Sequence, residues 1–360
     1  MQHFILFGTY TELEPHAEEP ERLKGIHIYR ADDQYRLLES CQQVQASSNP
    51  SFLTLHPNGR FVYAVNEYEP EASGSDGVRS GTVSAFSFDA QTGLLEFLNS
   101  QSSHGLDPCH LCVDRTGRFV ILANYSGGSV CVLPILEDGK LGDACDVVQH
   151  HGSSNISRPH PHAVMFDPSN RFLLVPDLGL DKLMVYEFNA STGTLEPGSE
   201  PVVVTAKGAG PRQLCLHPTG SFVYQINELN STMTAYRFDH GALTELETVS
   251  SLPVGFEGHN TGADVRVTPN GRFLYGSNRG HDSIVIFAIG DAGTLELVGH
   301  QSTFGKNPRS FAISPNGEFL LVANQGSNTV VEFRIDHSTG TLTPTGIKLE
   351  VPTPVCVHYV

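Results

Sequence analysis

Apolar and polar residues alternate in short stretches along the whole chain, and turn-forming residues interrupt them every few positions. One series of such stretches runs through Ser51–His56, Arg60–Asn66, Thr82–Phe88 and Leu94–Ser100. A Pro-Asn-Gly turn at 57–59 separates the first two stretches. A period of two residues bounded by such turns is typical of antiparallel strands. No window of eleven or more residues has a convincing helical period, so the pattern predicts an all-β chain.

A longer repeat organises these stretches. Each copy begins with Pro or Gly, passes through an apolar stretch and a turn, and reaches a Phe eleven positions later. The six Phe residues are separated by 58, 53, 50, 51 and 46 positions. They are Phe61, Phe119, Phe172, Phe222, Phe273 and Phe319. A four-stranded repeat of roughly 50 residues is typical of a β-propeller blade.

The two ends of the chain supply one further blade. The C-terminal stretch Pro354–Val360 matches only the first strand of a repeat, and His3–Tyr10 matches the second. Ile26–Tyr29 and Leu37–Val44 then serve as the third and fourth strands. Joining the ends in one blade closes the ring and removes open sheet edges. We therefore predict a single domain, residues 1–360, folded as a seven-bladed β-propeller with four antiparallel strands per blade.

Two positions of the repeat should form rings around one mouth of the central channel. In an antiparallel blade the start of the first strand lies beside the end of the second. The position after the leading Pro or Gly holds Ser51, Cys109, His162, Arg212, Ala263, Arg309 and Val355. The position six after the Phe holds Glu67, Tyr125, Leu178, Glu228, Arg279 and Gln325. This concentration of ionisable groups indicates a ligand site, and an ion-pair network is the structural alternative.

Further candidates adjoin these rings. The position before the second ring holds Asn66, Asn124, Asp177, Asn227, Asn278 and Asn324. Asn at a strand end commonly supports the following turn, so the structural interpretation is favoured for this position as a whole. Asn227 and Asn278 remain substrate-binding candidates, together with Arg309 and Glu67. Asp264 and Arg266 are near competitors in the fifth copy of the repeat and join the same list.

Two histidines precede one of the predicted strands. His160 and His162 point to the same side if the segment is extended, as Pro159 and Pro161 favour. Paired imidazoles suit acid–base chemistry near neutral pH. Two histidines with no obvious third ligand are a weak metal signal, so we predict no metal. His150 and its neighbour His151 fall in the preceding loop and are expected to be exposed.

Two insertions belong to the same type of loop on adjacent blades. They are Glu12–Lys24 and the stretch between Glu69 and Ser80. They could cover part of the channel mouth, or they could be solvated acidic loops.

Composition narrows the classes of partner. With 22 basic and 39 acidic residues the formal charge is 22 − 39 = −17, which disfavours nucleic acid and anionic membranes. No apolar stretch approaches the roughly 18 residues of a membrane span, and no basic leader of a signal peptide is evident. Seven cysteines, an odd number in a long chain, do not form a disulfide framework, so a cytoplasmic location is expected. The absence of Trp excludes propellers built on Trp-Asp repeats.

The chain resembles a known family in five segments. These are Phe7–Thr11, Arg158–His162, Gly210–Arg212, Ile226–Glu228 and Ser277–Gly280. They are similar to segments of the lactonase family of seven-bladed propellers, which includes bacterial 6-phosphogluconolactonases and fungal carboxy-cis,cis-muconate cyclases. The resemblance covers essentially the whole chain and agrees with the predicted fold.

The resemblance implies a set of catalytic residues. The family's proposed residues are a His, an Arg, a Glu and a second Arg. By motif, the His falls on the His160/His162 pair without a choice between them. The others fall on Arg212, Glu228 and Arg279.

The resemblance foremost implies hydrolysis of a small anionic lactone, 6-phosphogluconolactone of the pentose phosphate pathway, without a metal or organic cofactor. Glu228 or a histidine would activate water, Arg212 would stabilise the developing oxyanion, and Arg279 and Arg309 would hold the phosphate. One alternative is a cycloisomerase acting on carboxy-cis,cis-muconate with the same four residues. Another is a non-catalytic propeller that binds a small molecule or a protein. A monomer or weak homodimer is expected.

Overall fold

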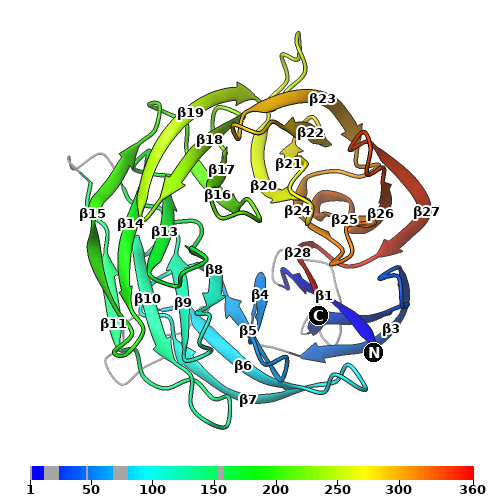
Figure 1. Ribbon diagram of the computed structural model, residues 1–360. Coiled ribbons are helices and arrows are strands. Elements are labelled where there is room, and N and C mark those ends of the chain that lie inside the picture. Colours follow the sequence, from blue (N-terminus) through cyan, green and yellow to red (C-terminus); the bar gives the residue numbers. More distant parts are fainter. Residues whose placement is uncertain (1, 12–23, 46–47, 68–79, 153–157) are drawn as a thin grey trace.

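The computed structural model describes residues 2–11, 24–45, 48–67, 80–152 and 158–360. Seven four-stranded antiparallel sheets surround a central channel, which Figure 1 shows along its axis. This confirms the predicted seven-bladed β-propeller. A short 3-10 helix, Gln325–Ser327, stands beside them. The two insertions expected near the mouth fall almost entirely outside the described residues.

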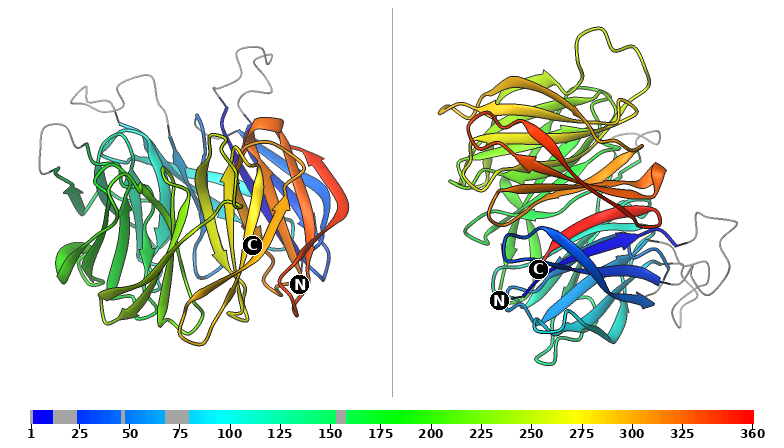
Figure 2. Two further views of the ribbon diagram at one scale, coloured as in Figure 1. Left: turned by 90° about the horizontal axis from the view of Figure 1, so that it is seen from above. Right: turned by 90° about the vertical axis from the view of Figure 1, so that its right-hand side faces the viewer.

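One blade combines both ends of the chain, as predicted. It is ordered β28-β1-β2-β3 and consists of Pro354–Tyr359, His3–Thr9, Lys24–Ala31 and Leu37–Gln45. β1 and β28 pair antiparallel from Ile5 opposite Tyr359 to Thr9 opposite Pro354. Figure 2 shows the two ends of the chain close together.

The other six blades each use four consecutive strands. Two blades comprise β4–β7 (Phe52–Leu55, Phe61–Asn66, Thr82–Phe88, Leu95–Ser102) and β8–β11 (Pro108–Val113, Phe119–Asn124, Ser129–Pro134, Asp146–Gln149). The next two comprise β12–β15 (Met165–Phe166, Phe172–Asp177, Lys182–Asn189, Thr194–Val204) and β16–β19 (Pro211–Leu216, Phe222–Asn227, Thr232–Asp239, Ala242–Ser250). The last two comprise β20–β23 (Thr261–Val267, Phe273–Arg279, Ser283–Ile289, Leu295–Ser302) and β24–β27 (Pro308–Ile313, Phe319–Asn324, Thr329–Ile335, Leu342–Glu350).

The hydrophobic core lies between successive blades. The second strands β5, β9, β13 and β25 are buried along their whole length, because each is covered on both faces by neighbouring blades. The outermost strands, such as β27, expose alternate residues to water. In the described part of the chain, no helix is long and apolar enough to cross a membrane.

One contact repeats from blade to blade. The Phe near the start of each second strand packs against a glycine with positive φ in the outer turn of the next blade. A Cβ atom on Gly139 would clash with the ring of Phe61. The six pairs are Phe4/Gly93, Phe61/Gly139, Phe119/Gly193, Phe172/Gly241, Phe222/Gly293 and Phe273/Gly340. At the seventh junction the Arg36 guanidinium lies over the ring of Phe319, with its central carbon 5.9 Å from the ring centre. The repeating Phe is thus the residue that joins the blades.

Tyrosines reinforce three of these junctions. The hydroxyl of Tyr63 donates to the carbonyl oxygen of Gly139 at 3.1 Å, and Tyr275 donates to Gly340 at 2.8 Å. Tyr224 makes the same bond to Gly293 at 3.1 Å. Each buried hydroxyl therefore finds an acceptor on the adjacent blade.

We expect Gly139→Ala to destabilise the protein more than Gly59→Ala. Both glycines have positive φ, +83° and +71°, which costs an alanine about 1 kcal/mol or more. Nothing lies within 4 Å of a Cβ on Gly59, whereas at Gly139 the Phe61 ring must move. Overpacking adds about 1–3 kcal/mol. Urea unfolding of both variants measures the difference, and equal losses would refute the role of this junction.

Candidate active site

In several first strands, a shift in strand pairing directs the side chain of one residue toward the channel mouth. The register slips by one position between Pro108 and His110, between Pro211 and Gln213, and between Pro308 and Ser310. The residues left over are Cys109, Arg212 and Arg309. Such bulges re-aim a side chain and are common beside functional sites. Ala263 and Val355 also fall at register shifts, so five of the seven residues of the first predicted ring lie at bulges.

Glu228 gathers two arginines at the mouth. Its Oε2 lies 2.8 Å from Nε of Arg212 and 3.0 Å from a terminal nitrogen of Arg279. Glu228 directly follows β17, Arg279 ends β21, and Arg212 sits at the bulge of β16. The second guanidinium nitrogen of Arg212 donates to the carbonyl oxygen of Ala263. Three residues proposed from sequence as catalytic are therefore in direct contact.

These charges are buried at an electrostatic cost. Side-chain exposure is 5% for Arg212, 11% for Arg279 and 18% for Glu228. Burial, and then the positive charge of Arg212, lower the pKa of Arg279, while Glu228 raises it. Removing one partner from such a group leaves an uncompensated buried charge. Glu228 is consequently the residue that permits two guanidinium groups to lie side by side.

Arg309 forms a second cationic centre with Tyr10. Its guanidinium donates to the Tyr10 hydroxyl at 2.8 Å and lies 5.3 Å from the centre of that ring. Burial raises the pKa of Tyr10, which Arg309 partly offsets, and the nearby Glu67 raises it further. Burial lowers the pKa of Arg309, but Tyr10, Glu67 and Glu228 outweigh it and raise the pKa overall.

Tyr10 is a site residue that the sequence interpretation missed. It lies six positions after Phe4, the same offset as in the second ring. Phe4 packs on Gly93 as the repeating Phe of its blade. The match of His3–Tyr10 with a second strand places Tyr10 at the ring position of Tyr125, but the ring was counted only in the six full copies of the repeat.

Three arginines gather at the mouth. Among the described residues, Arg212, Arg279 and Arg309 lie near Glu67 and Glu228, and Asp264 lines the narrow cavity below with Arg212 and Arg309. These guanidinium groups are set in a chain whose formal charge is −17. They provide local positive charge for an anionic ligand that the outer surface would repel.

Tyr125 brings the two candidate histidines together. The His160 ring stacks on Tyr125 with centroids 4.5 Å apart, and the His162 ring meets its edge at 5.5 Å. Nδ1 of His160 lies 2.9 Å from the Tyr125 carbonyl oxygen. Because a carbonyl only accepts, Nδ1 carries the proton and Nε2 keeps a free lone pair. His160 is therefore oriented as a base.

His162 lies deeper than His160. It is buried, and that burial together with the charges of Arg212 and Arg309 lowers its pKa well below the ordinary histidine value. At neutral pH it is a neutral hydrogen-bonding group. The two histidines consequently have different electrostatic environments within one segment.

Asp177 positions the histidine segment. Its Oδ1 accepts from the backbone N–H of His160 at 2.8 Å and of Leu180 at 3.0 Å. Its Oδ2 lies 2.6 Å from Nδ1 of His150, whose Nε2 meets the Tyr186 hydroxyl at 2.9 Å. His150 is only 3% exposed, so its expected exposure was wrong. The aspartate at this position of the repeat requires a buried donor, which His150 supplies.

The two candidate asparagines point into the blades and not into this cluster. Asn227 donates to Thr232 and Thr234 at 2.9 and 3.1 Å, and Asn278 donates to the Ser251 carbonyl oxygen at 2.8 Å. Both asparagines are buried within their blades, in line with the structural interpretation.

Asp264 lies below the mouth inside the channel. It accepts from Ser310 and from the backbone N–H of Phe311, each at 3.2 Å. Arg266 reaches Asp264 at 3.3 Å and lines the opposite end of the channel. The structure thus brings Asp264 next to Arg212 and Arg309 in the narrow cavity below the mouth and places Arg266 at the opposite end.

The channel is narrow just below the mouth. A cavity of about 20 Å³ is lined by Glu67, His162, Arg212, Asp264 and Arg309, among others. A larger cavity of about 600 Å³ opens at the opposite end. We place the candidate active site at the mouth, because the paired arginines and the oriented histidine lie there. Among the described residues, no three or more His, Cys, Asp or Glu side chains gather as a metal ion would require.

Comparisons with known proteins agree on one family. The family described as "Lactonase, 7-bladed beta-propeller" matches residues 4–359. A 6-phosphogluconolactonase of Bacillus subtilis is 34% identical over 342 residues, covering 93% of this chain and 94% of that protein. One of Pectobacterium carotovorum is 35% identical and covers 89% and 90%. The solved structure of a periplasmic gluconolactonase from Pseudomonas aeruginosa is 32% identical, with a TM-score of 0.89 and coverage of 100% and 99%.

We expect His162→Gln to make the protein less sensitive to acid. The pKa of His162 is lower in the folded than in the unfolded chain, so the unfolded state binds an extra proton below about pH 6.5. This residue therefore lowers the free energy of unfolding as the pH falls, by up to about 1.4 kcal/mol per pH unit. Replacing this histidine should reduce by one the number of protons taken up on unfolding. The free energy of unfolding should then depend less steeply on pH.

Urea unfolding from pH 4.5 to 7.5 tests this expectation. His110 and His358, whose pKa values burial lowers to about 3 and about 4, remain in both proteins and provide a common background. If the free energy of unfolding depends on pH equally in the variant and the parent, the pKa of His162 is not lowered in the folded protein.

Proposed function

The chain belongs to the lactonase family of seven-bladed β-propellers, and from this premise we propose that it hydrolyses 6-phosphogluconolactone at the channel mouth. The observation that carries this proposal is the contact of one carboxylate, Glu228, with both Arg212 and Arg279. The names of the Bacillus and Pectobacterium relatives support the phosphorylated lactone as substrate.

Arg212 is suited to stabilise the transition state. When water attacks a lactone, the carbonyl oxygen gains negative charge, and a fixed donor in a buried site stabilises it strongly. Arg212 is held on one side by Glu228 and on the other by the Ala263 carbonyl oxygen. Its orientation is set before substrate binds, so little reorganisation accompanies the reaction.

His160 is our choice for the general base. Its Nε2 lone pair accepts a proton from the attacking water, whose oxygen bonds to the carbonyl carbon. Collapse of the tetrahedral intermediate breaks the ring C–O bond, and the imidazolium returns its proton to the departing ring oxygen. His162 is a weaker base because its pKa is depressed. Glu228 is occupied by two guanidinium groups, so its role is to position them.

Arg279 and Arg309 provide charge for the phosphate group. Guanidinium groups match phosphate oxygens in geometry and retain their charge when buried. The guanidinium groups of Arg212, Arg279 and Arg309 locally offset the repulsion that the chain's −17 charge exerts on an anion. We also propose a cytoplasmic location, since all seven cysteines are free thiols.

We expect Arg212→Ala to lower kcat/KM for 6-phosphogluconolactone by about 100-fold or more, the usual loss for an oxyanion donor. The assay uses freshly generated lactone with spontaneous hydrolysis subtracted. The control is Arg272→Ala, an exposed arginine that donates to the His337 carbonyl oxygen and lies away from the mouth. A change within threefold for Arg212→Ala would exclude the oxyanion role. If the parent protein shows no turnover, carboxymuconates are tested next by ultraviolet absorbance.

Separate substitutions of His160 and His162 distinguish which histidine is the general base. We expect His160→Gln to lower kcat by about 100-fold or more, because general bases contribute roughly that factor. His162→Gln should lower kcat much less. The larger loss of kcat in His162→Gln would assign the base to His162 instead.

A further inference from the structure

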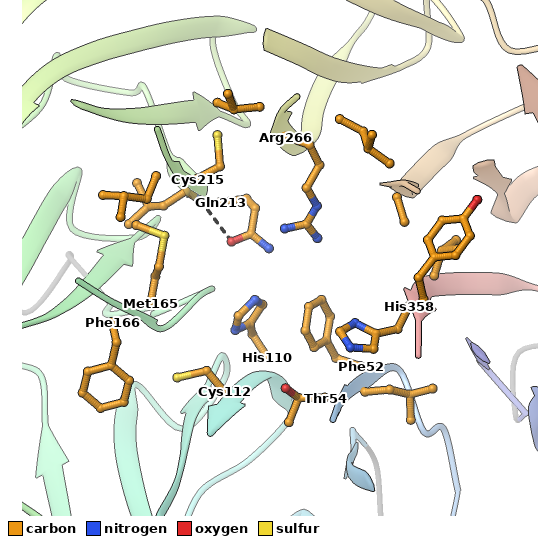
Figure 3. A pocket seen from close by; sticks show the side chains of 18 of the residues that line it. Phe52, Thr54, His110, Cys112, Met165, Phe166, Gln213, Cys215, Arg266 and His358 are labelled. Carbon is orange, nitrogen blue, oxygen red and sulfur yellow. Dashed lines mark hydrogen bonds between the residues drawn. The ribbon is translucent and has the colours of Figure 1, made fainter. Parts of the chain in front are cut away.

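The cavity at the opposite end of the channel is large enough for a small molecule. It has a volume of about 600 Å³, within the range of roughly 300–1,000 Å³ found for ligand sites. The first strands of all seven blades line it, and Figure 3 shows their side chains converging from around the ring. Its walls are mainly apolar and include Phe52, Val113, Met165, Ile313 and Val357.

Two buried polar side chains present donors to this cavity. Gln213, 5% exposed, uses its Oε1 to accept from the backbone N–H of Leu214 at 3.0 Å, so its NH₂ group faces the channel. His110, 8% exposed, uses Nδ1 to accept from the backbone N–H of Val164 at 3.3 Å. Its proton is therefore on Nε2. In both residues the acceptor atom is occupied and a donor remains.

Arg266 supplies a third donor and a positive charge. Figure 3 shows its guanidinium pointing into the channel beside the amide nitrogen of Gln213, with His110 across from them. Two donors cannot bond to one another, so an acceptor placed between them would satisfy both. Arg266 also contacts Asp264 at 3.3 Å, but that carboxylate accepts from Ser310 and two backbone N–H groups as well.

The charges that line the cavity favour an anion. Arg115 and Arg266 line it, and no carboxylate is among its described lining residues. Arg115 is partly engaged, because its Nε donates to the Asp167 carbonyl oxygen at 3.2 Å. His358 also lines the cavity, and burial, with Arg266, lowers its pKa to about 4, so it is neutral at neutral pH. In a chain of formal charge −17, such a cavity is an unusual environment.

We propose that this second cavity is a binding site for a small organic carboxylate with an apolar body. The carboxylate would accept from Arg266, Gln213 and His110, and the body would pack on the apolar walls. Charge-assisted hydrogen bonds of this kind are the strongest polar contacts available to a ligand. The apolar walls favour such a molecule over inorganic phosphate, which has no surface to bury.

The second cavity opens at the other end of the channel from the candidate active site. Gln213 and His110 line it and also line the narrow part of the channel, next to Arg212, His162 and Arg309, whereas Glu228 and Arg279 line neither. The inference therefore does not depend on lactone hydrolysis. Substitutions at one end can be judged against substitutions at the other.

Binding of 3-phenylpropanoate, measured by isothermal titration calorimetry, tests the proposal. We expect saturable binding that Gln213→Leu weakens about tenfold and Arg266→Met weakens more, because each removes a donor to a charged group. The uncharged analogue 3-phenylpropanamide should bind at least about tenfold more weakly. Inorganic phosphate should not compete. Arg279→Met, at the other end of the channel, is the matched control and should bind normally.

Several results would overturn the proposal. These are absence of binding at millimolar concentration, equal binding of the amide, binding unaffected by Gln213→Leu, and loss of binding in Arg279→Met. If Arg266→Met does not fold, Gln213→Leu still tests the proposal, because it removes one hydrogen-bond donor and no charge. Hydrolysis of 6-phosphogluconolactone by the same preparations reports separately on the mouth, so failure of either proposal can be recognised.

Discussion

The packing of a Phe against a glycine of the next blade is the contact on which the rest of the structure depends. A blade has two apolar faces and cannot bury either of them alone. The repeating Phe meets each following outer turn where only a glycine leaves room for the ring, as at Phe61 and Gly139. Because this contact recurs at six junctions and Arg36 takes the seventh position against Phe319, the ring closes around a channel of defined width.

The closed ring allows an acidic protein to hold cations in its interior. Each first strand faces the channel, and a one-residue register shift directs Arg212 and Arg309 to the mouth. Arg266 faces the other end, where Arg115 also lies. Buried positive charge requires compensation, which Glu228 provides at the mouth and Asp264 provides inside the channel. The channel therefore offers two anion-attracting ends, separated by a narrow part lined by His110 and Gln213.

The repeat carried much of the site prediction. A constant offset from the repeating Phe was enough to bring Glu228 and Arg279 to the same mouth as Arg212, and the structure shows them in contact. Tyr10 was missed as a site residue although His3–Tyr10 was matched with a second strand, because the ring position was counted only in the six full copies of the repeat. His150 was assigned to an exposed loop because its partner, Asp177, is 27 residues away and belongs to another element. Residues outside the repeat have no offset from which their position can be inferred.

The sequence by itself determined the blade architecture, the closure by both termini and most of the charged residues of the mouth. A strand period of two and a fixed spacing of turns are local properties, and they translate directly into strand order and register. Only the tertiary structure decided that one carboxylate holds two arginines, that His160 keeps its free nitrogen at Nε2, and that Arg266 serves the opposite end of the channel. Those features depend on side-chain directions after the ring has closed, when residues from different blades meet across the channel.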